Sequence, residues 1–150
     1  MFPFSFGRTI EVPVTNNSME SVSEMMLSTL ARRIKAEKPN SISSNQRQIT
    51  FSGGFFRFVG NWNLLVPIDH GVIDVVPDGN RLLISYKIWF IGLFILSSLM
   101  TIMFAFAIFS SGFTLQNLVT VARIWLLFFG GNFVIAVVRF HNFVRSALAM

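Results

Sequence analysis

The stretch that decides the fold is IWFIGLFILSSLMTIMFAFAIF, residues 88–109, which contains no charged side chain. As an α-helix these 22 residues would be about 33 Å long, enough to cross a bilayer core of about 30 Å. Ser110, Ser111 and Gly112 follow and break the apolar run. We therefore predict a membrane-spanning helix over residues 88–109.

A second apolar run follows after a short connection. Residues 124–138 alone would form a helix of about 22 Å, too short to cross the core without tilt. We therefore draw the second span over residues 118–138, which places Arg123 inside it, near its beginning. The two runs predict a hairpin of two transmembrane helices.

The composition divides the chain into a polar part and an apolar part. Hydrophobic residues make up 53% of the 150 residues and the mean hydropathy is +0.61, which is too apolar for a soluble domain of this size. All seven acidic residues lie before position 80. We expect a soluble domain over residues 1–86 and a transmembrane hairpin over residues 87–150.

The charge distribution argues against nucleic-acid binding. The net charge is +5, but residues 1–86 carry eight basic and seven acidic side chains, which leaves only +1 in that part. The connection 110–117 has no basic residue, so the positive-inside rule places both termini and the soluble domain in the cytoplasm. The surplus basic residues lie in or beside the apolar runs, at Lys87, Arg123, Arg139 and Arg145.

Residues 1–86 have the pattern of a small α+β domain. A helix is predicted after Asn17 or Ser18, with a buried stripe made of Val22, Met25, Met26, Leu27, Leu30 and Ile34. The serine- and asparagine-rich segment 39–45 is expected to be a loop, and residues 77–80 (PDGN) a hairpin turn. We predict a small antiparallel sheet with one helix, in the order β-α-β-β-β-β, with strands over residues 9–14, 48–51, 55–59, 72–76 and 81–86.

Small and polar residues near the middle of the two spans predict where the helices touch. Small side chains let two backbones approach closely, and a side-chain amide in lipid needs a hydrogen-bond partner. Contact within the hairpin is the simplest interpretation, and contact with another subunit or a transported ligand is the alternative. The predicted contact residues are Ser97, Ser98 and Thr101 in the first span and Gly130, Gly131 and Asn132 in the second.

Four residues are candidates for the membrane interface, namely Trp62, Tyr86, Trp89 and Arg123. Aromatic rings with a polar edge favour that layer. Arg123 either extends its guanidinium to the headgroups or pairs with a partner's acidic residue, because the hairpin itself contains no acid. No flexible spacer separates residues 81–86 from the first span, so we expect the domain to rest against the membrane.

The sequence contains no recognisable catalytic, metal or cofactor site. It has no cysteine and no motif typical of a phosphate loop, a dinucleotide site, a nucleophile elbow or a zinc protease. His70 lies four residues before Asp74, which could orient it as a general base, although a surface histidine beside a turn is the simpler interpretation. Two distant histidines are too few donors for a metal site.

Three segments carry a resemblance to known sequences. They are GGFFRFVGNWNLLVPIDHG (residues 53–71), the PDG turn (77–79) and FGGNFVIAVVRFHNFVR (129–145). Together they resemble a type of small bacterial membrane protein with two spans, over most of residues 47–145. The resemblance implies a location in a bacterial inner membrane, and it implies no activity, cofactor or site.

Three classes of function remain. The favoured class is a non-enzymatic accessory or scaffold protein, whose hairpin anchors a cytoplasmic domain that binds another membrane protein or a second copy of the chain. The first alternative is a binder or sensor of lipid or another apolar ligand, suggested by the aromatic residues Phe55, Phe56, Phe58 and Trp62. The second alternative is a membrane-bound enzyme that uses His70.

The topology can be tested with a reporter that is active only outside the cytoplasm. Fused after Phe113, in the connection between the spans, the reporter should be active. Fused after Met150, it should be silent. The opposite pattern of activity would show that the soluble domain lies outside the cytoplasm.

Overall fold

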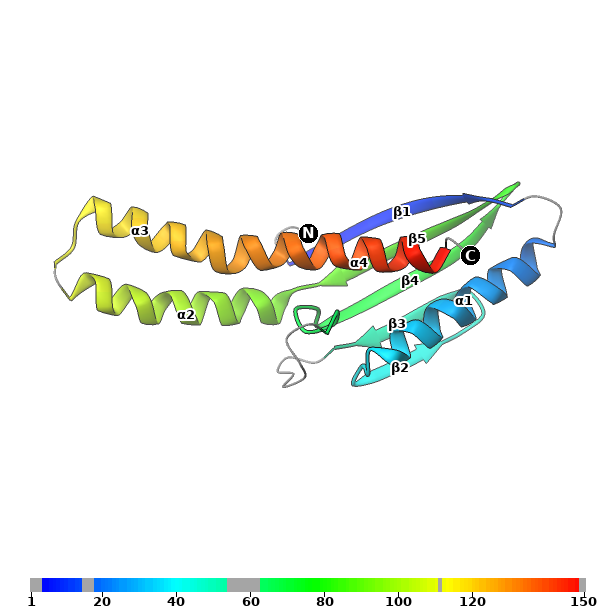
Figure 1. The fold of residues 1–150 in the computed structure, drawn as a ribbon, viewed down its shortest axis with the longest axis horizontal. Coiled ribbons are helices and arrows are strands. Elements are labelled where there is room, and N and C mark those ends of the chain that lie inside the picture. The colour runs from blue at the N-terminus through cyan, green and yellow to red at the C-terminus, as the bar shows by residue number, and fades with distance from the viewer. Residues whose placement is uncertain (1–3, 15–17, 54–62, 111, 149–150) are drawn as a thin grey trace.

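The computed structural model describes residues 4–14, 18–53, 63–110 and 112–148. They form an antiparallel sheet with helices on one face, and a two-helix hairpin that continues from one end of the sheet (Figure 1). This arrangement confirms the predicted α+β class with a helical hairpin. The elements are β1 (Ser5–Pro13), α1 (Met19–Ala36), β2 (Ser41–Ser44), β3 (Gln48–Ser52), β4 (His70–Asp78), β5 (Arg81–Trp89), α2 (Ile91–Phe109), α3 (Leu115–Trp125), a π-helical segment η1 (Leu126–Gly131) and α4 (Asn132–Leu148).

The described strands form one sheet in the order β1-β5-β4-β3-β2, and every neighbouring pair is antiparallel. The predicted turn joins β4 to β5, and Gly79 adopts the positive φ of +56° that such a turn favours. The segment expected to be a loop contains a strand instead, because Ser41–Ser44 pairs with β3 at the sheet edge. Its side chains are mostly exposed, so it lacks the alternation that identifies a strand. The predicted strand 55–59 lies outside the described residues.

One face of the sheet is the core face, and it has a gap at Gly71. A Cβ at this position would lie 2.3 Å from the Phe51 Cζ atom, so only glycine leaves room for that ring. Phe51 fills the gap and in turn stacks on Phe140 of α4, with 5.8 Å between the ring centroids. The remaining strand residues buried on this face alternate as expected, and they are Ile49, Ile73, Val75, Leu82, Ile84, Tyr86 and Ile88.

Helix α1 covers the core face over β2, β3 and β4. Ser18 is its N-cap residue, and Leu27, Leu30 and Ile34 are its buried apolar residues, as the sequence pattern predicts. Met25 was expected in the buried stripe, but its side chain is 67% exposed. The reason is helical geometry, because Met25 lies about 200° around the helix from Leu27.

Helix α4 covers the rest of the core face, beside α1 (Figure 1). Helices α3, η1 and α4 form one continuous helix of 34 residues, Leu115–Leu148. Its first part pairs with α2, and its last part packs on the sheet. The core therefore includes residues from both sides of position 87. The buried residues of α4 follow steps of three and four, and they are Ala136, Phe140, Val144 and Ala147.

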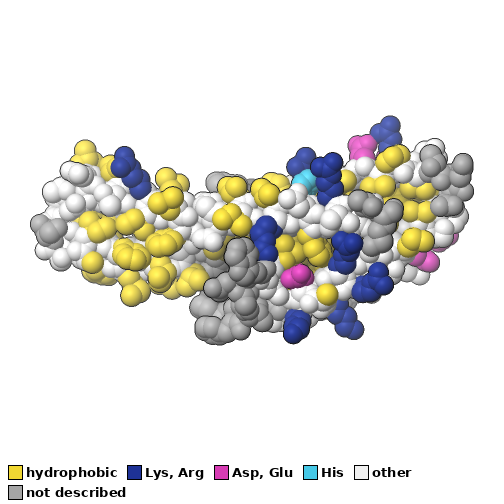
Figure 2. Space-filling view, viewed as in Figure 1, with side chains coloured by type: hydrophobic (Ala, Val, Ile, Leu, Met, Phe, Trp, Pro, Cys, Tyr) yellow, Lys and Arg dark blue, Asp and Glu magenta, His cyan; other side chains and the backbone are white. Residues whose placement is uncertain are grey.

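The hairpin presents an apolar surface. Helix α2 and the 34-residue helix are both long and apolar enough to cross a membrane, and most of their side chains are not buried. On the face shown in Figure 2, hydrophobic side chains are frequent over the hairpin, whereas most of the basic and acidic side chains lie over the half that contains the sheet. A soluble protein would bury such helices. The two helices are therefore candidates for the predicted membrane spans.

The sheet extends away from the hairpin, roughly along the same long axis (Figure 1). Strand β5 ends at Trp89 and α2 begins at Ile91, so the two elements are nearly continuous. If the hairpin crosses a membrane, only this end of the sheet lies near the lipid. This differs from the expectation that the domain rests against the membrane, because β5 leads directly away from α2.

The role of α4 in the core predicts a large loss of stability in the Phe140→Ala variant. Phe140 is fully buried against Phe51 and Tyr86, so the truncation should lower the free energy of unfolding by about 3–5 kcal/mol. Urea unfolding in a mild detergent, followed by circular dichroism, measures the change. Asn142→Ala is the control, because Asn142 is exposed on the same helix and should change stability by less than about 0.5 kcal/mol. Equal stability of the two variants would contradict the packing of α4 on the sheet.

Candidate functional site: a cavity between the hairpin and the sheet

The segment 63–69 closes the end of the sheet nearest the hairpin. A Cβ at Gly53 would lie 2.0 Å from the Ile68 carbonyl oxygen, so this glycine permits the segment to approach the end of β3. The Gly53 N–H donates to the Asp69 carbonyl oxygen at 2.7 Å, and the Asp69 N–H donates to the Trp89 carbonyl oxygen at 2.9 Å. These two bonds fix Asp69 between the ends of β3 and β5.

The carboxylate of Asp69 caps helix α2. The N-cap residue Phe90 makes no side-chain cap, and the Gly92 N–H donates to both carboxylate oxygens of Asp69, at 3.1 and 2.9 Å. An anion at a helix N-terminus also interacts favourably with the helix dipole. Asp69 therefore couples the sheet to the first residues of the hairpin.

Burial raises the pKa of the Asp69 carboxyl group above its ordinary value. The N–H groups of Gly92 and Ile91 and the nearby His70 act in the opposite direction, but they do not fully compensate for the loss of hydration. The ionised carboxylate is thus held in a partly dry environment beside the start of α2.

A cavity of about 520 Å³ lies next to Asp69, between α2, the helix η1–α4 and the segment 63–69. This volume is in the range of small-molecule sites. Most of the lining is apolar, including Leu96 and Met100 of α2 and Phe128 and Ile135 of the long helix. The polar groups in the lining are Asn63, Asp69, Ser97, Asn132 and Arg139.

The polarity of the cavity changes along the molecule. Asp69 lies at the sheet end, level with the start of α2, and Arg139 lies on the part of α4 that reaches the sheet. Met100 and Phe128 lie further along the hairpin. One end of the cavity is therefore charged and the other end is apolar, an arrangement that suits a molecule with a polar head and a hydrocarbon tail.

A π-helical segment forms one wall of this cavity. In η1 the backbone leaves the regular α-helical pattern, and the Asn132 Nδ2 donates to the Phe128 carbonyl oxygen at 2.7 Å. Short π-helical turns of this kind are frequent at functional sites. The Asn132 side chain thus bonds to its own helix and also lines the cavity.

The predicted contact between the two hairpin helices holds in part: Ser97 and Thr101 of α2 are buried, each 5% exposed, whereas the two glycines of the second span are not at the contact. A Cβ at Gly130 or Gly131 would meet no atom within 4 Å, so these glycines are not where the backbones approach each other. The Thr101 hydroxyl bonds to the Ser97 carbonyl oxygen within α2. Among the predicted residues, Ser98 makes the described hydrogen bond across the hairpin, accepting from Trp125 Nε1 at 3.1 Å.

Aromatic rings make further contacts between the two helices. The Phe94 ring packs edge-on against Trp125 and Phe129, with centroids 5.9 and 5.6 Å apart. Phe90 packs in the same way against Phe133 at 4.9 Å. These contacts join α2 to the long helix through large side chains rather than through glycines.

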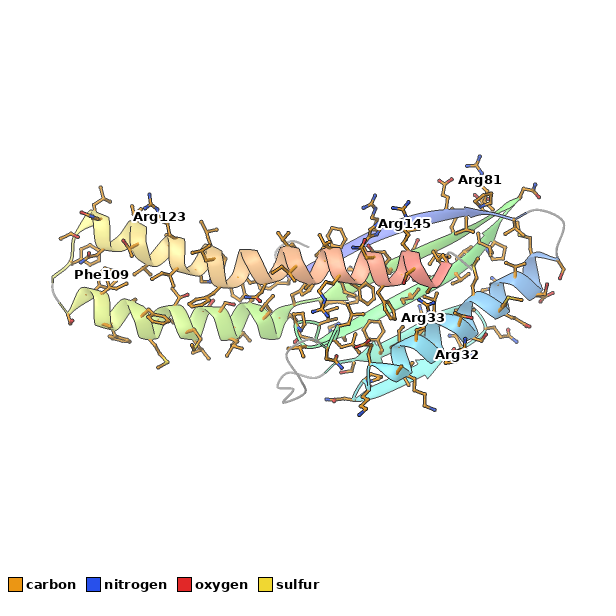
Figure 3. The ribbon with its side chains drawn as sticks, in the orientation of Figure 1. Arg32, Arg33, Arg81, Phe109, Arg123 and Arg145 are labelled. Atoms are coloured by element: carbon orange, nitrogen blue, oxygen red, sulfur yellow. The ribbon has the colours of Figure 1, made fainter. Side chains whose placement is uncertain are left out.

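Of the predicted interface residues, Trp62 lies outside the described part of the chain, and Tyr86 belongs to the core. Tyr86 is only 2% exposed, because α4 covers it with Phe140 and His141. Trp89 lies at the hairpin end of the sheet, where His70 stacks on its ring at 4.2 Å. Arg123 is exposed and points away from α2 (Figure 3). The interface roles of Trp89 and Arg123 stay predictions.

The structure separates His70 from Asp74. Both residues lie on the same face of β4, but four residues of extended strand place them about 13 Å apart. The Asp74 carboxylate instead accepts a hydrogen bond from Gln48 Nε2 at 2.6 Å. Asp74 therefore does not orient His70 as a general base. Among the described residues, no three histidine or acidic side chains come together as metal ligands.

No protein-family model, curated protein or solved structure matches the chain. The cavity was not predicted from the sequence, because it forms where three separate segments meet. Of the residues singled out in the two spans, Ser97 and Asn132 line the cavity, but the sequence suggested them for the contact between the helices.

The raised pKa of Asp69 predicts how pH acts on stability. Below its ordinary value of 3.8 the carboxyl is protonated in both the folded and the unfolded state. As pH rises from there to the raised pKa of the folded state, the unfolded state loses its proton first, so the Asp69 contribution to stability falls and then levels off. The free energy of unfolding of the wild type minus that of Asp69→Asn, measured by urea unfolding at a series of pH values, should follow this course. A difference that rises with pH would contradict the raised pKa.

Proposed function

We propose that this protein is a membrane-anchored binding protein for an anionic amphiphile, such as a fatty acid or one acyl chain of a lipid. The cavity between α2, α4 and the segment 63–69 is the observation that carries the proposal. Its apolar lining would contain the hydrocarbon chain, and its charged end would hold the head group.

The sign of the head group is argued from the charges at the cavity. The Asp69 carboxylate is engaged by the N–H of Gly92, and the positive end of the α2 dipole lies beside it. Arg139 adds a full positive charge to the lining. An anionic carboxylate or phosphate is therefore the head group that best complements this end of the cavity.

The location in the cell is part of the same proposal. We place the hairpin in a bacterial inner membrane, with the sheet and both termini in the cytoplasm. Support comes from the lack of basic residues in the connection 110–117 and from the charged side chains that gather at the sheet half of the molecule. The charged end of the cavity then lies near the cytoplasmic headgroups and the apolar end lies in the bilayer.

This proposal makes the accessory role favoured by the sequence more specific, because it names the class of ligand that the protein binds. A protein that holds an amphiphile beside the membrane would present it to a partner, either another membrane protein or a second copy of the chain. We do not extend the proposal to an enzyme that uses His70, because His70 stacks on Trp89 and Asp74 lies four residues further along β4.

Palmitate is the probe for testing the cavity. Native mass spectrometry of the protein in a mild detergent should show one bound palmitate per chain at saturation. The Met100→Trp variant fills the cavity and should weaken the binding about ten-fold, which corresponds to about 1.4 kcal/mol.

Met103→Trp is the matched control. Met103 lies on the same helix but is 68% exposed and does not line the cavity, so this variant should bind palmitate like the wild type. Equal weakening in both variants, or no saturable binding by the wild type, would overturn the proposal.

A further inference from the structure

A second charged site lies on the other flank of α4. Phe140 faces the sheet, so Arg139 and His141 project about 100° to either side of it. Arg139 reaches the cavity, whereas His141 and, one turn later, Arg145 lie on the side of strand β1. Figure 3 shows Arg145 on this side of α4.

Arg8 of β1 completes this group. It pairs in register with Tyr86 of β5, and Tyr86 is the residue that bonds to His141. Arg8 and Arg145 are both exposed and close enough to His141 to affect its charge. Three basic side chains from two elements therefore lie on the same flank of α4, at the edge of the sheet.

Within the described residues, the group has no acidic partner. All seven acidic residues of the chain are described, and neither Arg8 nor Arg145 forms an ion pair with any of them. Loss of hydration, followed by the charges of Arg8 and Arg145, lowers the pKa of His141. The two guanidinium groups are positively charged and would both attract an anion placed beside His141.

Tyr86 orients the histidine ring. The Tyr86 hydroxyl lies 3.0 Å from His141 Nδ1, and burial raises the pKa of Tyr86, so the hydroxyl keeps its proton. Nδ1 is thus engaged, and Nε2 is the ring nitrogen left for a ligand in the described part of the molecule. A planar donor between two guanidinium groups is suited to a phosphate.

The position of the group along β5 indicates where such a phosphate is found. Arg8 pairs with Tyr86, three residues before Trp89, and is therefore about 10 Å from the point where α2 begins. The headgroup layer adds about 5–8 Å to each side of the bilayer core. With the hairpin in the membrane, the group lies at the margin of that layer, where each basic residue attracts anionic lipid.

We infer that Arg8, His141 and Arg145 form a binding site for the phosphate of an anionic phospholipid, separate from the cavity on the other flank of α4. The inference rests on the hairpin being in a membrane. It does not depend on an amphiphile in the cavity.

The test uses the full chain in a nonionic detergent and three probes: dihexanoylphosphatidylglycerol, dihexanoylphosphatidylcholine and inorganic phosphate. The ring signals of His141 in nuclear magnetic resonance spectra, assigned with His141→Gln, report on occupancy. The phosphatidylglycerol probe should shift these signals saturably, and the zwitterionic probe should not. If inorganic phosphate bound as tightly as the phosphatidylglycerol probe, the site would be one for a free anion, and the assignment to a lipid would be overturned.

Two variants and one control locate the site. Arg8→Gln and Arg145→Gln should each weaken phosphatidylglycerol binding about five-fold, and the double variant about thirty-fold. Both side chains are exposed and lie on different elements, so a loss of binding in both variants would not come from a folding defect. Circular dichroism spectra of the variants check that they are folded. Arg32→Gln removes the same charge from the exposed surface of α1 and should have no effect. If Arg32→Gln weakened phosphatidylglycerol binding as much as the two variants do, the lipid would be attracted by the overall positive charge, and the proposed site would be overturned. The proposed site would also be overturned if the probe left the His141 signals unshifted.

Discussion

The stacking of Phe140 on Phe51 is the contact on which the rest of the structure depends. It joins the last part of the 34-residue helix to a strand that precedes the hairpin, so it ties both ends of the hairpin to one core. The glycine at position 71 makes the contact possible, because it leaves the volume into which the Phe51 ring fits. Without α4, the core face of the sheet over β5 would be open to water.

The candidate sites follow from this attachment. Because α4 must lie along the sheet, it crosses the end of the sheet at a fixed place, and its two flanks face different surroundings. One flank meets α2 and the segment 63–69 at the cavity, where Asp69 holds the start of α2. The other flank meets β1, where Tyr86 holds the His141 ring. The same helix thus separates an apolar cavity from a basic surface.

Much of the fold could be predicted from local patterns. The charge-free run at 88–109, the turn at 77–80 and the stripe of α1 each depend on residues near one another in sequence. Strand β2 could not be predicted, because its serines are exposed on both faces and carry no alternation. The role of α4 was missed for a different reason. Its stripe of Ala136, Phe140, Val144 and Ala147 is visible in the sequence, but the predicted second span ends at residue 138, and no element was predicted for the residues that follow.

The sites were less predictable than the fold, because they depend on contacts between distant segments. The spacing of His70 and Asp74 suggested a pair, but an extended strand separates residues that one turn of a helix would bring together. Gly130 and Gly131 suggested close packing, but a Cβ at either glycine would meet no neighbouring atom, and the rings of Trp125 and Phe129 make the contact with Phe94. Asp69 gave no local signal, since its partner Gly92 lies 23 residues further along the chain.

The continuous helix from Leu115 to Leu148 also constrains the order in which the protein can be made. A ribosome completes the strands and α2 well before it completes α4, so the newly made sheet must wait with Phe51 and Tyr86 uncovered. The covering residues become available only after the hairpin has been synthesised, and their position over the sheet requires the second helix to return to the side from which the first one left. If the two helices cross a membrane, failure of their insertion would leave exposed apolar surface on the polar half of the chain, a state that chaperones and proteases recognise. The covering of the sheet would then depend on the insertion of the hairpin.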